Sequence, residues 1–224
     1  MKKEESPLSA LIAYLPKGAF PLVERYLVLH KVHLTITRER SSVLGNYQGG
    51  YRGKNHRISV NGNLNKYSFL ITLLHEFGHL LAFEKFGTRI QAHGAEWKRE
   101  YGRVLASFIS RNIFPSDIES ELLATLKNPA ATSCAETSLL RILRKYDPPK
   151  PGFYLLEELA ENSFFRIKNG SIFCKGAKKR TRFLCWEAGT KKLYMFSPVI
   201  EVEHITGRKY VTAALAVNAK KKKR

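Results

Sequence analysis

The segment Leu73-Leu74-His75-Glu76-Phe77-Gly78-His79-Leu80-Leu81 places an HExxH pattern inside an apolar stretch that runs from Lys66 to Phe86 and ends at Gly87. This spacing predicts a helix over residues 66–86. Positions i and i+4 lie on one face of a helix, so His75 and His79 can bind one Zn²⁺ at about 2.0–2.1 Å. The carboxylate of Glu76 can then reach a water on the metal rather than the metal itself.

A catalytic zinc site needs a third protein ligand and one open position. The best candidate is His93, in the sequence His93-Gly94-Ala95-Glu96-Trp97. Gly94 permits a sharp backbone turn there, and Trp97 can anchor the following helix in the core. Other nearby acids leave the third ligand open at this point: Glu84, Glu96 and Glu100.

The remaining pattern predicts a mixed helical and β domain over residues 1–146. Helices are expected over 8–30, with a break at Pro16-Lys17-Gly18, and over 95–110, 118–126 and 136–146; strands are expected over 32–36 and 56–61. Glycines around Tyr47 predict turns. Residues Arg57 to Asn61 are expected to form an edge strand beside the cleft, where an extended substrate can pair.

The proline-rich run 147–152 predicts a linker, because prolines cannot continue a helix. A small antiparallel β module is expected over 147–215, with short strands over 164–167, 171–174, 181–186 and 192–196. A disordered basic tail is expected over 216–224.

The charge balance favours a polyanionic partner. The 224 residues include 38 Lys and Arg against 19 Asp and Glu, a net charge of +19, which is typical of proteins that bind nucleic acid. Cations expected to follow phosphates are Lys175, Lys178, Lys179, Arg180 and Arg182, with Phe173, Phe183, Trp186 and Tyr194 as stacking surfaces. The alternative is a solvated basic hairpin over an aromatic core.

Residues 1 to about 110 resemble the SprT-like family of zinc metalloproteins, which includes the Spartan DNA-dependent proteases. The resemblance rests on HEFGH, on HGAEW, and on the distance between His79 and His93. It implies an α+β fold, with a zincin-like helical domain and a small antiparallel sheet. It also implies one catalytic Zn²⁺ bound by His75, His79 and His93, with Glu76 as the general base.

The C-terminal region departs from the zinc ribbon that ends many members of this family. Only Cys174 and Cys185 lie in the equivalent β region, and Cys134 precedes the linker. A site with four Cys ligands is therefore excluded within one chain. We expect a ribbon-like module that packs apolar side chains in place of a metal, and a zinc held by Cys174, Cys185 and His204 stays open as an alternative.

Three hypotheses for function follow. The first is a zinc-dependent metallopeptidase of the HExxH type that acts on proteins bound or close to DNA, with the basic module contacting the DNA. The second is a nucleic-acid-binding protein with a non-catalytic zinc domain, and the third is a zinc hydrolase for a small substrate.

Three cysteines argue against a disulfide scaffold. No apolar run approaches the ~20 residues of a membrane span. We expect a cytoplasmic protein that can associate with DNA or the nucleoid and that has no membrane partner.

Overall fold

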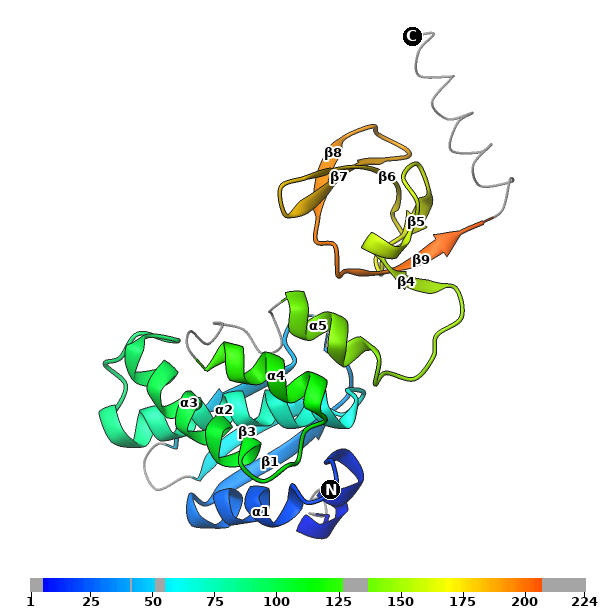
Figure 1. Ribbon diagram of the computed structural model, residues 1–224. Coiled ribbons are helices and arrows are strands. Elements are labelled where there is room, and N and C mark those ends of the chain that lie inside the picture. The colour runs from blue at the N-terminus through cyan, green and yellow to red at the C-terminus, as the bar shows by residue number, and fades with distance from the viewer. Residues whose placement is uncertain (1–5, 41, 51–54, 127–136, 207–224) are drawn as a thin grey trace, which may run out of the picture. The chain divides into compact units, whose positions relative to one another are not determined.

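The computed structural model describes residues 6–40, 42–50, 55–126 and 137–206 (Figure 1). The chain divides into two compact units, Met1–Pro148 and Pro149–Arg224, at the prolines of the expected linker. The expected tail over 216–224 and the residue Cys134 lie outside the described residues. Within the described part of the chain, no helix has the length and apolar character needed to cross a membrane.

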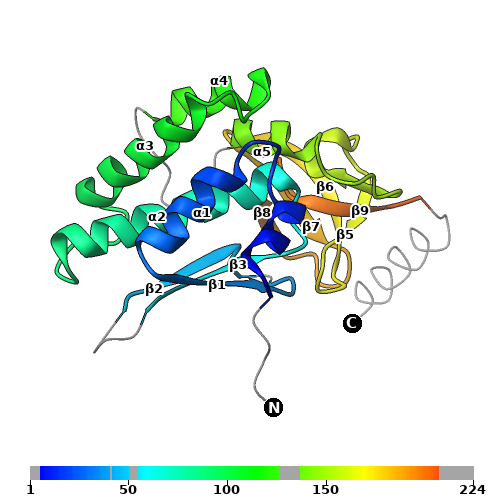
Figure 2. The same cartoon turned by 90° about the horizontal axis from the view of Figure 1, so that it is seen from below.

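The first unit combines helices with one small sheet, as the α+β expectation requires. Its elements are the 3-10 helix η1 (Leu8–Tyr14), α1 (Phe20–Leu29), β1 (Val32–Thr37), β2 (Gly45–Gln48), β3 (His56–Asn61), α2 (Lys66–Phe86), α3 (Ala95–Ile109), α4 (Ser116–Thr125) and α5 (Thr137–Arg144). Figure 2 shows α1 and α2 side by side over one face of the sheet. Helix α1 packs on β1, and α2 packs on β2 and β3.

The sheet corrects two expectations. Its order is β1-β3-β2, with β1 parallel to β3 and β2 antiparallel to it, so it is mixed rather than antiparallel. The segment Gly45–Gln48, expected as a turn, is the edge strand, and Arg57 to Asn61 lies in the central strand. Four residues with a leading glycine carry little strand signal by themselves, so this pairing becomes visible only in three dimensions.

Helix α2 is buried around most of its circumference. The side-chain oxygen of Asn65 accepts hydrogen bonds from the backbone N–H groups of Tyr67 and Ser68, which caps the N-terminus. Gly87 ends the helix with a φ of 73°, a left-handed conformation that favours glycine. Because the sheet and α3 cover opposite sides of α2, its side chains are held in a dry, packed environment.

Gly78 sets how closely α2 approaches α3. A Cβ atom there would lie 2.8 Å from Cβ of Tyr101 and 3.1 Å from Nε1 of Trp97. Both contacts are shorter than ordinary van der Waals separation, so a glycine is needed at the crossing. The close approach brings the HExxH turn of α2 against the first turns of α3.

The second unit is a six-stranded sheet in the order β4-β9-β5-β6-β7-β8, with antiparallel neighbours throughout. Its elements are β4 (Phe153–Leu155), the 3-10 helix η2 (Leu156–Glu158), β5 (Phe164–Arg166), β6 (Ile172–Lys179), β7 (Arg182–Glu187), β8 (Leu193–Phe196) and β9 (Glu201–Ile205). The four expected strands correspond to β5 to β8. Strands β4 and β9 were not expected.

The core of this unit is apolar. It is built from Leu156, Leu159, Phe165, Phe173, Cys185 and Val202.

Cys174 pairs in register with Trp186, whereas Cys185 pairs with Lys175. Neighbouring pairs point to opposite faces of a sheet, so the two thiols diverge. The alternative of a zinc held by Cys174, Cys185 and His204 is therefore contradicted: in the described residues these side chains do not form a metal-binding group.

Gly78→Ala is expected to destabilise the protein by about 1–3 kcal/mol, because the added methyl group overpacks the contact between α2 and α3. Gly102→Ala, on α3, is the matched control, since its Cβ would first meet Cδ2 of Leu126 at 4.0 Å. The control should raise stability by about 0.5–1 kcal/mol through helix propensity. Urea unfolding measures both; equal effects of the two variants would contradict the packing assignment.

Candidate metal centre

Three imidazole rings converge at the junction of α2 and α3. His75 and His79 lie one turn apart on α2, and His93 lies in the turn before α3. Nε2 of His93 is 3.1 Å from Nε2 of His75 and 3.0 Å from Nε2 of His79. In the described residues, these three side chains form the group able to hold a metal ion, with ligand atoms within 4.8 Å of one another.

His93 reaches this position through an unusual backbone conformation. Its φ is 59°, in the left-handed region, whereas Gly94 is extended with a φ of −71°. The sharp turn that we expected at Gly94 therefore occurs one residue earlier. A left-handed conformation is uncommon for a residue other than glycine and is often associated with functional sites. A Cβ at Gly94 would lie 3.0 Å from the carbonyl oxygen of Gln91, which explains the glycine there.

Trp97 forms the floor of the site, as its expected role as an anchor requires. Its ring centroid lies 4.6 Å from that of His75, 5.3 Å from that of His79 and 4.7 Å from that of His93. Trp97 is fully buried and stacks on Tyr101. This packing restricts the three imidazoles to orientations in which their Nε2 atoms face one another.

The three imidazoles are held in the neutral form that binds metals. Burial, reinforced by the neighbouring His79 and His93, lowers the pKa of His75 to about 3. Burial and the proximity of His93 lower the pKa of His79 to about 4, and burial lowers the pKa of His93 as well. Neutral imidazole nitrogens are ordinary zinc ligands, and three of them leave a fourth tetrahedral position open. The donor set therefore fits a catalytic Zn²⁺.

Glu76 lies beside the histidines and is itself only 4% exposed. Burial raises the pKa of its carboxyl to about 8, against the opposing effects of the Arg40 charge and a hydrogen bond from the backbone of Tyr47. Arg40 is fixed by Asn61, whose Oδ1 lies 2.8 Å from its Nε. The candidate base is thus approached by groups from β2 and from the loop that precedes it.

The strand β2 contacts Glu76 directly through a glycine. A Cβ at Gly45 would lie 2.6 Å from Oε1 of Glu76 and 2.7 Å from Cγ2 of Thr72. Any larger side chain would push β2 away from α2. Gly45, Tyr47 and Arg40 were not expected in this site, because β2 and the loop before it come close to α2 only through the pairing of β2 with β3.

Other nearby histidines and acids are occupied elsewhere. Nδ1 of His30 lies 2.7 Å from Oε2 of Glu84, and Nε2 of His56 lies 3.7 Å from its Oε1. The Tyr47 hydroxyl lies 2.9 Å from Nδ1 of His56, and the Tyr47 ring is nearly parallel to that of His79 at 6.4 Å. The acids left open as third ligands, Glu84, Glu96 and Glu100, are not in the metal-binding group.

The basic residues of the second unit separate into two kinds. Lys178, Lys179, Arg180 and Arg182 are exposed at the hairpin between β6 and β7. Lys175 is instead 4% exposed, with its Nζ 3.2 Å from the carbonyl oxygen of Glu157 and 2.5 Å from that of Leu159. The expectation that Lys175 contacts phosphate is therefore corrected: its ammonium group is used inside the unit.

The aromatic residues are likewise divided. Phe173 is buried in the core, and Phe183 lies under Lys175, whose Nζ is 4.1 Å from the ring centroid. Trp186 is half-buried, and Tyr194 is 41% exposed. An aromatic core under a basic hairpin thus accounts for Phe173 and Phe183, while Trp186 and Tyr194 retain surface that a base can contact.

Comparison with known families matches residues 24–117 to the SprT-like family. The match covers β1 to α3, and it includes all three histidines and Glu76. It confirms the resemblance stated from HEFGH and HGAEW. Neither the curated proteins nor the solved structures contain a match to the chain.

The stability of the metal-free protein should depend on pH through Glu76. Its folded pKa of about 8 lies above its ordinary value of 4.5, so folding favours the protonated acid and stability is lost as the pH rises from 4.5 through 8. Gln mimics the neutral acid. EDTA-treated Glu76→Gln should therefore gain stability over the wild type as the pH rises, by on the order of 2–4 kcal/mol at pH 8 and above. Thermal unfolding across pH tests this, and a constant difference at all pH values would contradict it.

Proposed function

We propose that this SprT-like protein is a zinc-dependent metallopeptidase that acts on proteins bound or close to DNA. The observation that supports the peptidase most directly is the convergence of three neutral imidazoles beside a buried carboxylate. A purely structural zinc site has no use for Glu76, and burying a carboxylate costs free energy that folding must offset. An enzyme is therefore favoured over a nucleic-acid-binding protein with a non-catalytic zinc domain.

His75, His79 and His93 would hold the metal through their Nε2 atoms. A zinc ion bound there supplies a Lewis acid that polarises the peptide carbonyl and acidifies a water molecule. Beside a bound metal ion, Glu76 would have a lower pKa, so that its carboxylate would be ionised near neutral pH and able to accept a proton. Trp97, packed beneath all three rings, keeps water from the protein side of the site.

Glu76 transfers the proton in both halves of the reaction. Its carboxylate accepts a proton from the attacking water as the new carbon–oxygen bond forms. The protonated acid then donates to the amide nitrogen as the carbon–nitrogen bond breaks, which leaves an amine and a carboxylic acid that still holds the second proton of the water. The backbone N–H of Tyr47 and the close approach of Gly45 keep the Glu76 carboxylate in one orientation during these steps.

The strand β2 offers a binding edge for the substrate. It pairs with β3 on one side and, among the described residues, lies at the edge of the sheet on the other. An extended peptide can add to such an edge through main-chain hydrogen bonds. Asn46 and Gln48 are exposed along it, so binding through β2 would depend mainly on the substrate backbone. This role replaces the one expected for Arg57 to Asn61.

The DNA part of the proposal rests on charge. The chain carries a net charge of +19, and from Asp147 onward it has 17 Lys and Arg against seven Asp and Glu. The exposed hairpin of Lys178, Lys179, Arg180 and Arg182 can contact phosphates without reading sequence. Holding the enzyme and its protein substrate on the same DNA raises their effective concentration.

Substitutions at the metal centre should separate metal binding from catalysis. His75→Ala should reduce the zinc content from about one ion per chain to near zero, because two imidazoles remain. Glu76→Gln should retain zinc and lose about 100-fold or more of the peptidase rate, because the general base is removed. Glu119→Gln on α4 is the control. Metal analysis and cleavage of an unfolded protein substrate measure these effects, and full activity of Glu76→Gln would reject the role of Glu76.

DNA should accelerate cleavage of a protein bound to the same DNA. We expect wild-type protein to cleave a DNA-bound protein faster with DNA than without it, and Glu76→Gln to show no cleavage in either case. Neutralising Lys178, Lys179, Arg180 and Arg182 to Gln should reduce the acceleration, which should also fall with rising salt. Salt-dependent DNA binding without any cleavage by the zinc-loaded protein would instead favour the non-catalytic alternative.

A further inference from the structure

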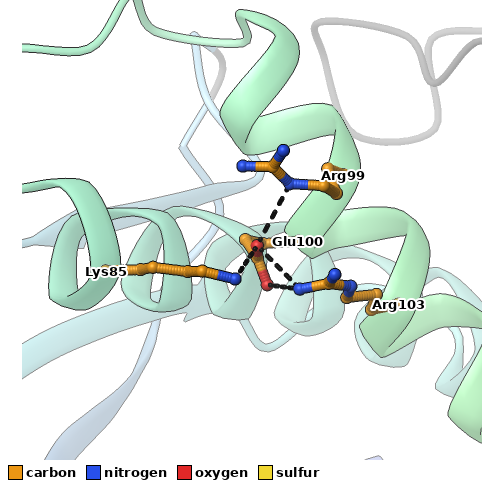
Figure 3. Close-up of polar contacts among 4 residues, drawn as sticks. All are labelled: Lys85, Arg99, Glu100 and Arg103. Carbon is orange, nitrogen blue, oxygen red and sulfur yellow. Dashed lines mark hydrogen bonds and ion pairs between the residues drawn. The ribbon is translucent and has the colours of Figure 1, made fainter.

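A buried carboxylate on α3 gathers three cations at the junction with α2. Glu100 is 5% exposed. Its Oε1 lies 3.2 Å from Nζ of Lys85, 3.1 Å from Nη1 of Arg103 and 3.5 Å from Nε of Arg99 (Figure 3). Nη1 of Arg103 also donates to Oε2, at 3.2 Å. Four charged side chains thus form one compact cluster in the first unit.

The cluster carries a surplus of positive charge. Burial raises the pKa of Glu100, but the hydrogen bonds and charges of Lys85 and Arg103 bring it below its ordinary value. One negative charge therefore faces three positive charges at neutral pH. The segment from Glu84 to Arg103 has the same sign, with five Lys and Arg against three Glu, and one of those acids, Glu84, is bound to His30.

Joining the helices does not require this surplus. Lys85 is on α2 and Glu100 on α3, so this single pair links the two elements. Arg99 and Arg103 lie on the same helix as Glu100 and add no connection between helices. Arg99 and Arg103 are themselves more than half exposed, so solvent screens their attraction to Glu100 and reduces what each pair adds to stability. A structural role accounts for Lys85 and Glu100 but leaves the two arginines unexplained.

The cations keep much of their surface and many of their donors available. The side chains of Lys85, Arg99 and Arg103 are 49%, 51% and 59% exposed. Figure 3 shows the terminal nitrogens of Arg99 turned away from Glu100. The Arg99 guanidinium and the Lys85 ammonium also lie over the ring of Phe86, at 5.1 Å and 5.5 Å from its centroid. The carboxylate and the ring hold these cations in place while leaving them able to bind an anion.

We propose that Lys85, Arg99 and Arg103 form a phosphate-binding site for a nucleic-acid backbone on the peptidase unit. Arginine and lysine side chains are the usual partners of backbone phosphates. The inference rests on the DNA part of the proposed function and adds a second contact, distinct from the hairpin between β6 and β7. Lys85 follows His79 by six residues on α2, about 9 Å of helix rise, so bound nucleic acid would pass close to the metal centre.

The test measures DNA binding by the full chain across a salt series. In Arg99→Gln/Arg103→Gln, the slope of log affinity against log salt should become shallower by about 2, because each phosphate contact contributes about 0.9. Raising the salt from about 50 to 200 mM should therefore weaken DNA binding by the variant about 10-fold less than it weakens DNA binding by the wild type. Lys17→Gln/Arg25→Gln, which removes the same charge from exposed positions elsewhere in the first unit, is the matched control. Unfolding temperatures check that both variants fold.

The outcomes distinguish this site from the proposed function. If both double variants change the slope equally, the effect is one of net charge and the site is rejected. If only the variant lacking the four hairpin cations loses slope, DNA binding stands and the site on α2 and α3 falls. Wild-type protein without salt-dependent DNA binding would overturn the DNA proposal itself. If Arg99→Gln/Arg103→Gln weakens the binding of poly-glutamate as much as it weakens the binding of DNA, the cations bind polyanions in general. That result would overturn the assignment to nucleic acid.

Discussion

The close packing of α2 against α3 determines how the first unit is assembled. Gly78 removes the side chain that would separate the helices, and Trp97 and Tyr101 fill the contact from α3. Trp97 then lies against all three imidazoles and fixes their orientation. Because two candidate ligands come from α2 and the third precedes α3, the set of three imidazoles is complete only when these helices are packed together.

The strand β2 connects the candidate base with the substrate edge. Its glycine approaches the Glu76 carboxylate, and the backbone of Tyr47 hydrogen-bonds to it. The other edge of the same strand is where we propose that a peptide backbone pairs. A displacement of β2 would therefore disturb the orientation of the acid and the position of the substrate together. This coupling explains why a short strand with weak intrinsic propensity has a glycine where it meets α2.

The positive charge of the chain has different roles in different places. Lys175 is buried and binds backbone carbonyl oxygens, so it contributes to the packing of the second unit. The cations at the hairpin between β6 and β7 are exposed, and we propose them as a nonspecific contact for a polyanion. Those around Glu100 are half-exposed and held in place by a buried acid. Net charge alone therefore does not show which cations are exposed and which are buried in the fold.

Local sequence determined the elements whose signals are contained within one segment. The helix over residues 66–86 agrees with the expectation because its cap at Asn65, its apolar run and its final Gly87 are all local. The spacing of HExxH likewise indicated His75 and His79, since one helical turn separates them whatever surrounds the helix. The resemblance to the SprT-like family, carried by HEFGH and HGAEW, added His93 as the third ligand.

Features that depend on segments distant along the chain became visible once the chain was folded. It made Gly45–Gln48 an edge strand, placed β1 parallel to β3, and brought Arg40 and Tyr47 to Glu76. It placed the left-handed turn at His93 and turned Lys175 inward. Strand pairing, burial and the meeting of charges are non-local, because each is set by which surfaces pack together. A one-dimensional pattern contains the side chains for those contacts but not their partners.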